Sequence, residues 1–152
     1  TGLGVLGLTD LFASVLFVDK SPQMVEQVRK KIERAQIKTA SAACADFCTD
    51  PIPKQTADYV LVSQVLLHVK DYALLLGKLY DALNPGGCLI IVDFYNNDKI
   101  ASDMVHNGFE QAELIRLLGE IGFAAAEART FYHGKNMFMH QDASLFLLKA
   151  SK

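Results

Sequence analysis

The chain has 152 residues, of which 51% are hydrophobic and 21% are charged, and its formal net charge is −2. A chain of this length and composition can bury one core, so we expect a single domain over residues 1–152. The charge argues against a broad basic face for nucleic acid, and no apolar run reaches the roughly 18 residues of a membrane span. Because no charged segment leads into an apolar one at the start, we expect a cytoplasmic protein.

Three glycines near the start, Gly2, Gly4 and Gly7, have the spacing G-x-G-x-x-G. In a dinucleotide-binding fingerprint this motif follows a strand and precedes an acid by about 20 residues. Here Asp19 follows Gly7 by only 12 positions, which disfavours a nicotinamide-dependent oxidoreductase. A better alignment takes Gly2 as the last glycine of a loop and Leu3–Phe12 as a short helix.

Residues 14–24, SVLFVDKSPQM, predict a strand that turns directly into a helix. Val15–Val18 is typical of a strand buried on both faces of a parallel sheet. Asp19 ends it, Ser21 can cap the next helix, and Pro22 suits the first helical position. Ligands of open α/β sheets bind at the carboxyl ends of strands, where an acid can accept hydrogen bonds from both ribose hydroxyls. An ordinary turn aspartate is the alternative.

The remaining elements follow from hydrophobic periodicity and turn residues. We expect helices at Pro22–Ala35, at 72–83 after the N-cap Asp71, and at Glu110–Ile121. We expect strands at Ile37–Ala45, Ala57–Val62, Cys88–Val92, Phe123–Phe131 and Ser144–Leu148. The last two should pair antiparallel through a polar connection at 132–141, because no helix separates them. Asp46 and Asp93 each follow a predicted strand, as Asp19 does, and residues 95–108 predict a mobile loop.

The three cysteines, Cys44, Cys48 and Cys88, have no histidine partner at metal-ligand spacing. We therefore predict no metal site and treat the cysteines as structural. A Cys44–Cys48 disulfide under oxidising conditions is the alternative, which a reducing cytosol disfavours.

Six segments occur in an order and spacing that resemble one enzyme family: TGLGVLGL, VLFVDKSPQM, ADF, SQVLLHVKD, LNPGG and HNGFEQAEL. Over essentially its whole length the chain resembles the class I S-adenosylmethionine-dependent methyltransferases, most of all the small-molecule group that includes ubiquinone- and menaquinone-biosynthesis-type enzymes. The resemblance implies an α/β, Rossmann-like sheet, mostly parallel, with a C-terminal antiparallel hairpin. It also implies S-adenosylmethionine as cofactor, S-adenosylhomocysteine as product and a small-molecule methyl acceptor.

For the nucleoside, the resemblance implies that Asp19 accepts hydrogen bonds from the two ribose hydroxyls. Lys20 and Met24 would flank the adenine. Asp46 would receive the adenine amino group, and the backbone N–H of Phe47 would reach a ring nitrogen. Met24 also lies on the apolar stripe of its helix, so core packing is its alternative role.

For the methionine end, the resemblance places Thr1 and Gly2 in the glycine loop and Ser63 and Gln64 beside the reacting methyl group. The family's first strand, with an acid-x-Gly-x-Gly run, should lie immediately before Thr1. That strand is central in the family, and without it both neighbouring strands would expose unpaired backbone. We therefore expect the 152 residues to belong to a longer polypeptide.

Two histidines are candidates for contact with the acceptor. Family members often carry Leu-His-His after the fourth strand, and this chain has His68 there, preceded by two leucines. A histidine can take a proton from a hydroxyl or amine at neutral pH, so His68 is a candidate base, with fixing of a loop as the alternative. His106 resembles the family's His-x-Gly-Phe element and is either structural or a substrate contact. No catalytic residue is assigned.

Two other functions stay open at this point. One is a domain that binds S-adenosylmethionine without catalysis, and the other, less favoured, is the nicotinamide-dependent oxidoreductase. The sequence does not name the methyl acceptor.

Overall fold

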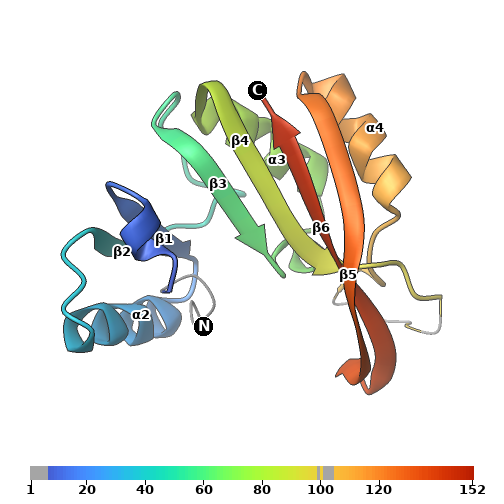
Figure 1. The fold of residues 1–152 in the computed structure, drawn as a ribbon, viewed down its shortest axis with the longest axis horizontal. Helices are drawn as coiled ribbons and strands as arrows, with labels where there is room; N and C mark the ends of the chain where they lie inside the picture. Colours follow the sequence, from blue (N-terminus) through green and yellow to red (C-terminus); the bar gives the residue numbers. More distant parts are fainter. Residues whose placement is uncertain (1–6, 99, 101–104) are drawn as a thin grey trace. The chain divides into compact units, whose positions relative to one another are not determined.

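The computed structural model describes residues 7–98, 100 and 105–152. The chain divides into two compact units, Thr1–Pro51 and Ile52–Lys152. Within the described residues, the first unit holds a two-stranded sheet and the second a four-stranded sheet in the order β3-β4-β6-β5 (Figure 1). The predicted α/β class with a C-terminal antiparallel hairpin is confirmed, and the single domain stays a prediction. No helix in this part of the chain is long and apolar enough to cross a membrane.

The first unit is built from a strand, a helix and a parallel strand. β1 (Val15–Asp19) pairs with β2 (Ala40–Cys44), and α2 (Pro22–Arg34) connects them. Ser21 caps α2 as predicted, since its Oγ accepts the N–H of Met24 at 3.4 Å. The helix buries one apolar stripe, formed by Val25, Val28 and Ile32.

Two predicted boundaries in this unit were wrong. Over residues 7–12, the described part of the helix expected at Leu3–Phe12, the structure has a 3-10 turn, η1 (Thr9–Leu11), in place of an α-helix. β2 begins at Ala40 and not at Ile37, because the backbone of Ile37 takes part in the hydrogen bonds that end α2. The N–H of Ile37 donates to the carbonyl of Ile32 at 3.1 Å and so satisfies one of the free carbonyls of the helix.

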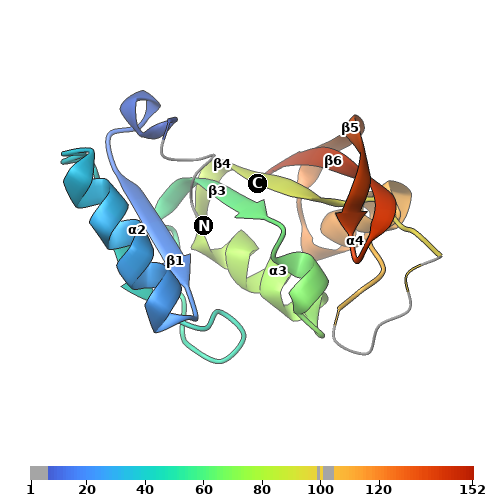
Figure 2. The ribbon, with the colours of Figure 1, turned by 90° about the horizontal axis from the view of Figure 1, so that it is seen from below.

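The second unit is a mixed sheet. β3 (Ala57–Ser63) pairs in parallel with β4 (Leu83–Phe94), β4 pairs antiparallel with β6 (Gln141–Ser151), and β6 pairs antiparallel with β5 (Ala124–Phe138). Helices α3 (Tyr72–Ala82) and α4 (Gln111–Ile121) lie against one face of this sheet (Figure 2). Alternation along the paired strands gives that face a row of buried side chains. The row consists of Val62, Leu89, Ile91, Asp93, Phe146, Leu148 and Ala150.

The C-terminal hairpin is antiparallel, as predicted, but longer. Where the sequence predicts a polar connection over 132–141, β5 and β6 continue to a two-residue turn at Met139 and His140. These residues have φ of 49° and 63°, the positive values that a type I′ hairpin turn requires. Asparagine and glycine usually mark such turns, and their absence here is why the sequence pattern missed it.

β1 and β3 each have one paired neighbour within the described residues. Both strands carry large exposed apolar side chains, since Leu16 is 62% exposed and Tyr59 is 57% exposed. An edge strand of this kind offers a surface for a further strand. The strand expected before Thr1 stays a prediction.

The turn Asn84-Pro85-Gly86-Gly87 follows the end of α3 at Ala82, as predicted, but it belongs to β4, which begins at Leu83 and not at the predicted Cys88. The Nδ2 of Asn84 donates to Oδ1 of Asp58 at 2.8 Å and ties the turn to β3. A Cβ on Gly87 would lie 2.8 Å from the carbonyl oxygen of Asn84 and 3.1 Å from that of Asp58. Gly87 is therefore needed for this close approach of backbone to backbone.

We expect Gly87→Ala to lower the free energy of unfolding by about 1–3 kcal/mol, because the added methyl group presses on two backbone oxygens. Gly77→Ala is the matched control: Gly77 lies within α3, and a Cβ there meets nothing within 4 Å. That change should raise the free energy of unfolding by about 0.5–1 kcal/mol through helix propensity. Urea unfolding measures both, and equal effects of the two substitutions would contradict the close approach at Gly87.

Candidate functional site

Five of the predicted cofactor-binding residues lie at one edge of the two-stranded sheet: Asp19, Lys20, Met24, Asp46 and Phe47. β1 and β2 end together, since Asp19 pairs with Cys44 and the N–H of Ala45 donates to the carbonyl of Asp19 at 3.2 Å. The parallel pairing therefore brings the residues that follow both strands to the same edge.

Asp19 is exposed and closes the turn into α2. Its Oδ1 accepts the N–H of Ser21 at 2.8 Å, which is the ordinary turn role of an aspartate. Within the described residues no hydrogen bond reaches Oδ2. One carboxylate oxygen therefore holds the turn, and the other is available to a ligand.

Asp46 is half-buried and begins a tight turn after β2. Its Oδ1 accepts the N–H of Cys48 at 2.9 Å, and its own N–H donates to Oδ2 of Asp50 at 2.9 Å. The carbonyl of Asp46 also accepts the N–H of Asp50 at 2.7 Å. These bonds fix the orientation of the Asp46 carboxylate at the strand end.

The other three residues of this edge are Lys20, Met24 and Phe47. Lys20 is exposed, and its carbonyl accepts a weak hydrogen bond from Sγ of Cys44 at 3.6 Å. Met24 and Phe47 are half-buried, so the adenine contact and the packing role predicted for Met24 are both compatible with its place. Thr1 and Gly2 lie outside the described residues.

In the second unit, Ser63 is the last residue of β3 and Gln64 is the next residue, and both are exposed. Gln64 has φ of 52°, and its N–H donates to the carbonyl of Val92 in β4 at 2.7 Å. The left-handed conformation at Gln64 turns the chain out of the sheet beside the end of β4. Both residues therefore lie at the carboxyl edge of the sheet, and their place beside the reacting methyl group stays a prediction.

His68 is the last residue of η2 (Leu66–His68), a short 3-10 turn after β3. The side chain is exposed, and its ring makes no hydrogen bond within the described part of the chain. The backbone N–H of His68 donates to the carbonyl of Val65 at 3.0 Å. Contact with an acceptor stays a prediction for this residue.

His106 is half-buried and bound to the same turn. Its backbone N–H donates to the carbonyl of Leu67 at 2.9 Å, and its Nε2 lies 3.0 Å from the carbonyl of Val69. A carbonyl can only accept, so Nε2 carries the proton in this contact. The ring also packs edge-on against Tyr72, with centroids 5.3 Å apart. His106 thus has a structural role, and contact with substrate stays a prediction.

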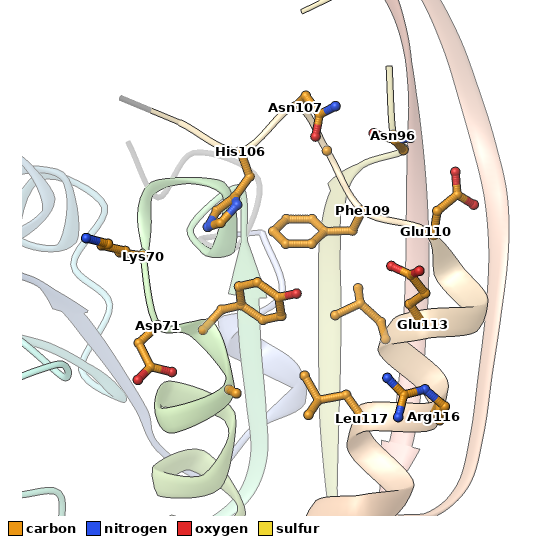
Figure 3. Close-up of a pocket in the computed structure, with 14 residues that line it drawn as sticks. Lys70, Asp71, Asn96, His106, Asn107, Phe109, Glu110, Glu113, Arg116 and Leu117 are labelled. Carbon is orange, nitrogen blue, oxygen red and sulfur yellow. The ribbon is translucent and has the colours of Figure 1, made fainter. Parts of the chain in front are cut away.

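A groove of about 1070 Å³ lies beside His106 (Figure 3). The rings of Tyr72, His106 and Phe109 pack together in its wall, and its rim is charged, with Lys70, Glu110, Glu113 and Arg116. The hydroxyl of Tyr95 donates to Oε2 of Glu110 at 2.8 Å, and this hydrogen bond raises the pKa of Tyr95. Asp71 lines the groove as well, so charges of both signs occur along it.

Asp93 lies near the carboxyl end of β4, in the buried row of the sheet. The sequence motifs assign it no role in the site. The side chain is fully buried; Oδ1 accepts the N–H of Phe94 at 2.8 Å, and Oδ2 has no hydrogen-bond partner among the described residues. Burial raises the pKa of the carboxyl to about 6. The backbone N–H groups of Phe94, Leu67 and Leu66 and the charge of His106 lower it.

The sequence does hold a signal for Asp93. It is the first residue after an apolar run that predicts a buried strand, and Asp19 and Asp46 stand in the same position after their strands. Acids at the ends of parallel strands mark the edge where ligands bind, and this rule, applied to all three strands, would have included Asp93. The difference is that Asp19 is exposed and Asp46 half-buried, whereas Asp93 is buried in the core.

Comparison with known proteins adds a family to this geometry. Residues 1–91 match the family model described as a methyltransferase domain. The chain belongs to this methyltransferase family. The resemblance that the sequence motifs carry is thereby confirmed.

Two curated relatives show how far the similarity extends. The chain is 31% identical over 109 residues to a demethylmenaquinone methyltransferase of Thermus thermophilus, a match that covers 72% of this chain and 49% of the relative. It is 30% identical over 104 residues to a carboxy-S-adenosyl-L-methionine synthase of Cronobacter sakazakii, covering 64% of this chain and 42% of the relative. The match therefore spans less than half the length of each of these relatives.

Solved structures share the fold at low sequence identity. Phosphoethanolamine N-methyltransferase 2 of Haemonchus contortus, in complex with S-adenosyl-L-methionine, aligns with a TM-score of 0.79 at 16% identity, over 98% of this chain and 46% of that one. A SAM-dependent methyltransferase of Aquifex aeolicus aligns with a TM-score of 0.71 at 17% identity, over 99% of this chain and 76% of that one. The predicted Rossmann-like fold is confirmed.

We expect Asp93 to make the stability of the chain depend on pH. Its pKa is higher in the folded protein than the ordinary value of 3.8, so the folded state binds this proton more tightly than the unfolded state. The stability that Asp93 contributes is present below about pH 4 and is lost as the pH rises to about 6. A pKa difference of this size corresponds to about 3 kcal/mol.

Urea unfolding of the wild type and of Asp93→Asn at pH 4 and pH 7.5 measures this effect. Between pH 4 and pH 7.5, the wild type should lose about 3 kcal/mol of unfolding free energy relative to Asp93→Asn. Glu127→Gln, which removes an exposed acid from β5, is the control and should show no such change. Parallel pH profiles of wild type and Asp93→Asn would contradict the raised pKa.

Proposed function

We propose that this chain forms the cofactor-binding part of an S-adenosylmethionine-dependent methyltransferase that acts on a small molecule. The observation that carries the proposal is the edge of the first unit, where Asp19 and Asp46 follow two neighbouring parallel strands. Such an edge is where α/β sheets bind nucleosides. Family membership supports the same function, and relatives named for methyl transfer and for an S-adenosyl product support the cofactor.

The nucleoside is assigned to the first unit. The open Oδ2 of Asp19 fits a ribose hydroxyl donor, because Oδ1 already holds the turn. The fixed carboxylate of Asp46 fits the amino group of adenine, and the N–H of Phe47 would donate to a ring nitrogen. Lys20 and Met24 would lie against the flat faces of the base.

The methionine end is assigned to Thr1, Gly2, Ser63 and Gln64. S-adenosylmethionine, when bound, supplies a methyl group on a sulfonium, which needs no activation by the protein. The protein has to align the acceptor with that methyl group and exclude water. Alignment of this kind can contribute about 7–11 kcal/mol in the best-oriented cases.

A hydroxyl or amine acceptor must also lose a proton. His68 is the candidate for that step, because its exposed ring can accept the proton and pass it to solvent. His106 is less suited to it, since its Nε2 is engaged with the carbonyl of Val69 at 3.0 Å.

Calorimetry on the full polypeptide that carries this sequence tests the proposal. S-adenosylhomocysteine should bind and NADH should not, and no heat with S-adenosylhomocysteine or S-adenosylmethionine would overturn the assignment. Transfer of a labelled methyl group to a panel of small-molecule acceptors then separates two outcomes. Turnover supports the enzyme, whereas binding without turnover across the panel favours a non-catalytic cofactor-binding domain.

We expect Asp19→Ala to weaken S-adenosylhomocysteine binding by about 2–4 kcal/mol, or about 30-fold to 1000-fold, because a charge-assisted pair of hydrogen bonds is lost. Asp19→Asn keeps an acceptor for the Ser21 N–H and should lose less affinity. Asp10→Ala, which removes an exposed acid from η1, is the control. Unchanged affinity in Asp19→Ala would leave Asp19 as a turn residue only.

A further inference from the structure

We propose that His106 is a positioning residue for His68, the candidate proton acceptor. It forms hydrogen bonds with the backbone carbonyls on both sides of His68, those of Leu67 and Val69. The inference rests on the proposed function, in which His68 takes a proton from the methyl acceptor. It adds a second histidine that acts on the first through the backbone and needs no contact with the acceptor itself.

Hydrogen bonds hold both of the peptide groups that meet at His68. In the peptide group before it, the N–H of His68 donates to the carbonyl of Val65 at 3.0 Å. The carbonyl of the same peptide group, that of Leu67, accepts the backbone N–H of His106 at 2.9 Å. In the peptide group after it, the N–H of Val69 donates to the first carbonyl of η2 at 3.0 Å. Because both peptide planes are held, the direction of the Cα–Cβ bond of His68 is held with them.

The side chain of His106 holds the next carbonyl along the chain. Its Nε2 donates to the carbonyl of Val69 at 3.0 Å, at the residue where the turn ends. A 3-10 turn of three residues cannot satisfy the carbonyls at its own end, so a donor has to come from outside it. His106 supplies two such donors, one from its backbone and one from its ring.

His106 is itself held against the end of β4. Three residues later, the N–H of Phe109 donates to the carbonyl of Phe94 at 2.9 Å, and the carbonyl of Phe109 accepts the N–H of Asn96 at 3.1 Å. The ring of His106 packs against the ring of Tyr72, with centroids 5.3 Å apart, and against that of Phe109, at 5.6 Å. The backbone of His68 is therefore tied to β4 as well as to β3, the strand that precedes its turn.

Gly108 allows the chain after His106 to approach β4 this closely. Its φ is 104°, and a Cβ at this position would overlap the carbonyl group of Tyr95. A residue with a side chain could not adopt this conformation without moving the backbone of one segment or the other. The two residues between His106 and Phe109 thus form a short, fixed connection.

The ring of His68 needs this kind of support because it has none of its own. It is exposed and makes no hydrogen bond within the described part of the chain. Leu66 and Leu67, which precede it in the turn, are 0% and 4% exposed and anchor the turn in the core. A base is commonly oriented by a third group that bonds to its ring. Here the ring nitrogens stay available, and the orientation is set through the backbone.

A double-variant cycle on the full polypeptide tests the positioning, with labelled methyl transfer to an acceptor from the small-molecule panel. His68→Gln should lower the turnover rate by about 100-fold or more. His106→Ala, which keeps the backbone bond to Leu67 and loses the ring donor, should lower it by about tenfold. In the double variant the change at His106 should have no further effect, because it acts through the ring of His68. Effects that multiply would overturn the proposal, since a purely structural residue lowers turnover in both backgrounds.

His106→Gln separates the hydrogen bond from the packing of the ring. The amide nitrogen of glutamine can donate to the carbonyl of Val69, so turnover should return to within about threefold of the wild type. Tyr80→Leu is the control, because Tyr80 packs against Phe123 at the other end of α3, with centroids 4.9 Å apart. It removes an aromatic contact away from the turn and should leave turnover unchanged. No recovery in His106→Gln would contradict the role of the donor.

Amide hydrogen exchange gives a readout that does not depend on turnover. The N–H groups of His68 and Val69 should exchange about tenfold faster in His106→Ala than in the wild type, and within about threefold of the wild type in His106→Gln. Unchanged exchange in His106→Ala would show that His106 does not hold the turn. A wild type that binds S-adenosylhomocysteine but transfers no methyl group would instead overturn the proposed enzyme and the role of His68 in it, and the exchange rates would still decide whether His106 fixes this backbone.

Discussion

Parallel pairing of neighbouring strands is the constraint that groups the candidate site residues within each unit. Because the carboxyl ends of parallel strands meet at one edge, β1 and β2 bring Asp19 and Asp46 together across a helical connection. In the second unit, β3 and β4 do the same for Gln64 and Asp93. At each edge these residues lie at or directly after the ends of paired strands, so no long loop has to place them.

Two of the strand-end acids serve local structure with one carboxylate oxygen, and this shapes what they can do for a ligand. Asp19 keeps the turn into α2, and Asp46 keeps the turn after β2. A carboxylate with one oxygen held by backbone N–H groups cannot rotate freely, so its second oxygen is presented in a fixed direction. The ordinary turn role of Asp19 and its proposed ribose role are therefore compatible, since each uses a different oxygen.

Local signals predicted most of the fold. Ser21 and Asp71 each accept a backbone N–H at the start of a helix, which is why α2 and α3 begin where the sequence predicts. Errors arose where a hydrogen bond at the end of a helix or an unusual turn sets the boundary. Ile37 closes α2 rather than opening β2, and the hairpin turns at Met139 and His140 without glycine or asparagine.

The sequence predicted which site residues lie at the same edge of a sheet. It did not predict which of their side chains are buried. Asp19 and Asp46 could be grouped because each follows a run that predicts a parallel strand. The burial of Asp93 could not, because Cys88–Val92 is apolar at every position and shows no alternation that separates the two faces of β4. Which face the helices cover is a property of the assembled sheet.

The ionisation of Asp93 lowers the stability of the folded chain. An uncharged residue in the same row would avoid the desolvation that raises the pKa of the carboxyl to about 6, so the core alone would favour one. The N–H of Phe94 gives the carboxylate one hydrogen-bond partner, and Oδ2 has none among the described residues. His106 holds the neighbouring turn, because its backbone N–H donates to the carbonyl of Leu67 and its Nε2 to the carbonyl of Val69, and these carbonyls would otherwise need another donor. The hydrogen bonds of this turn therefore come from His106 and from the backbone, whereas the ionisation of Asp93 acts on the stability of the core.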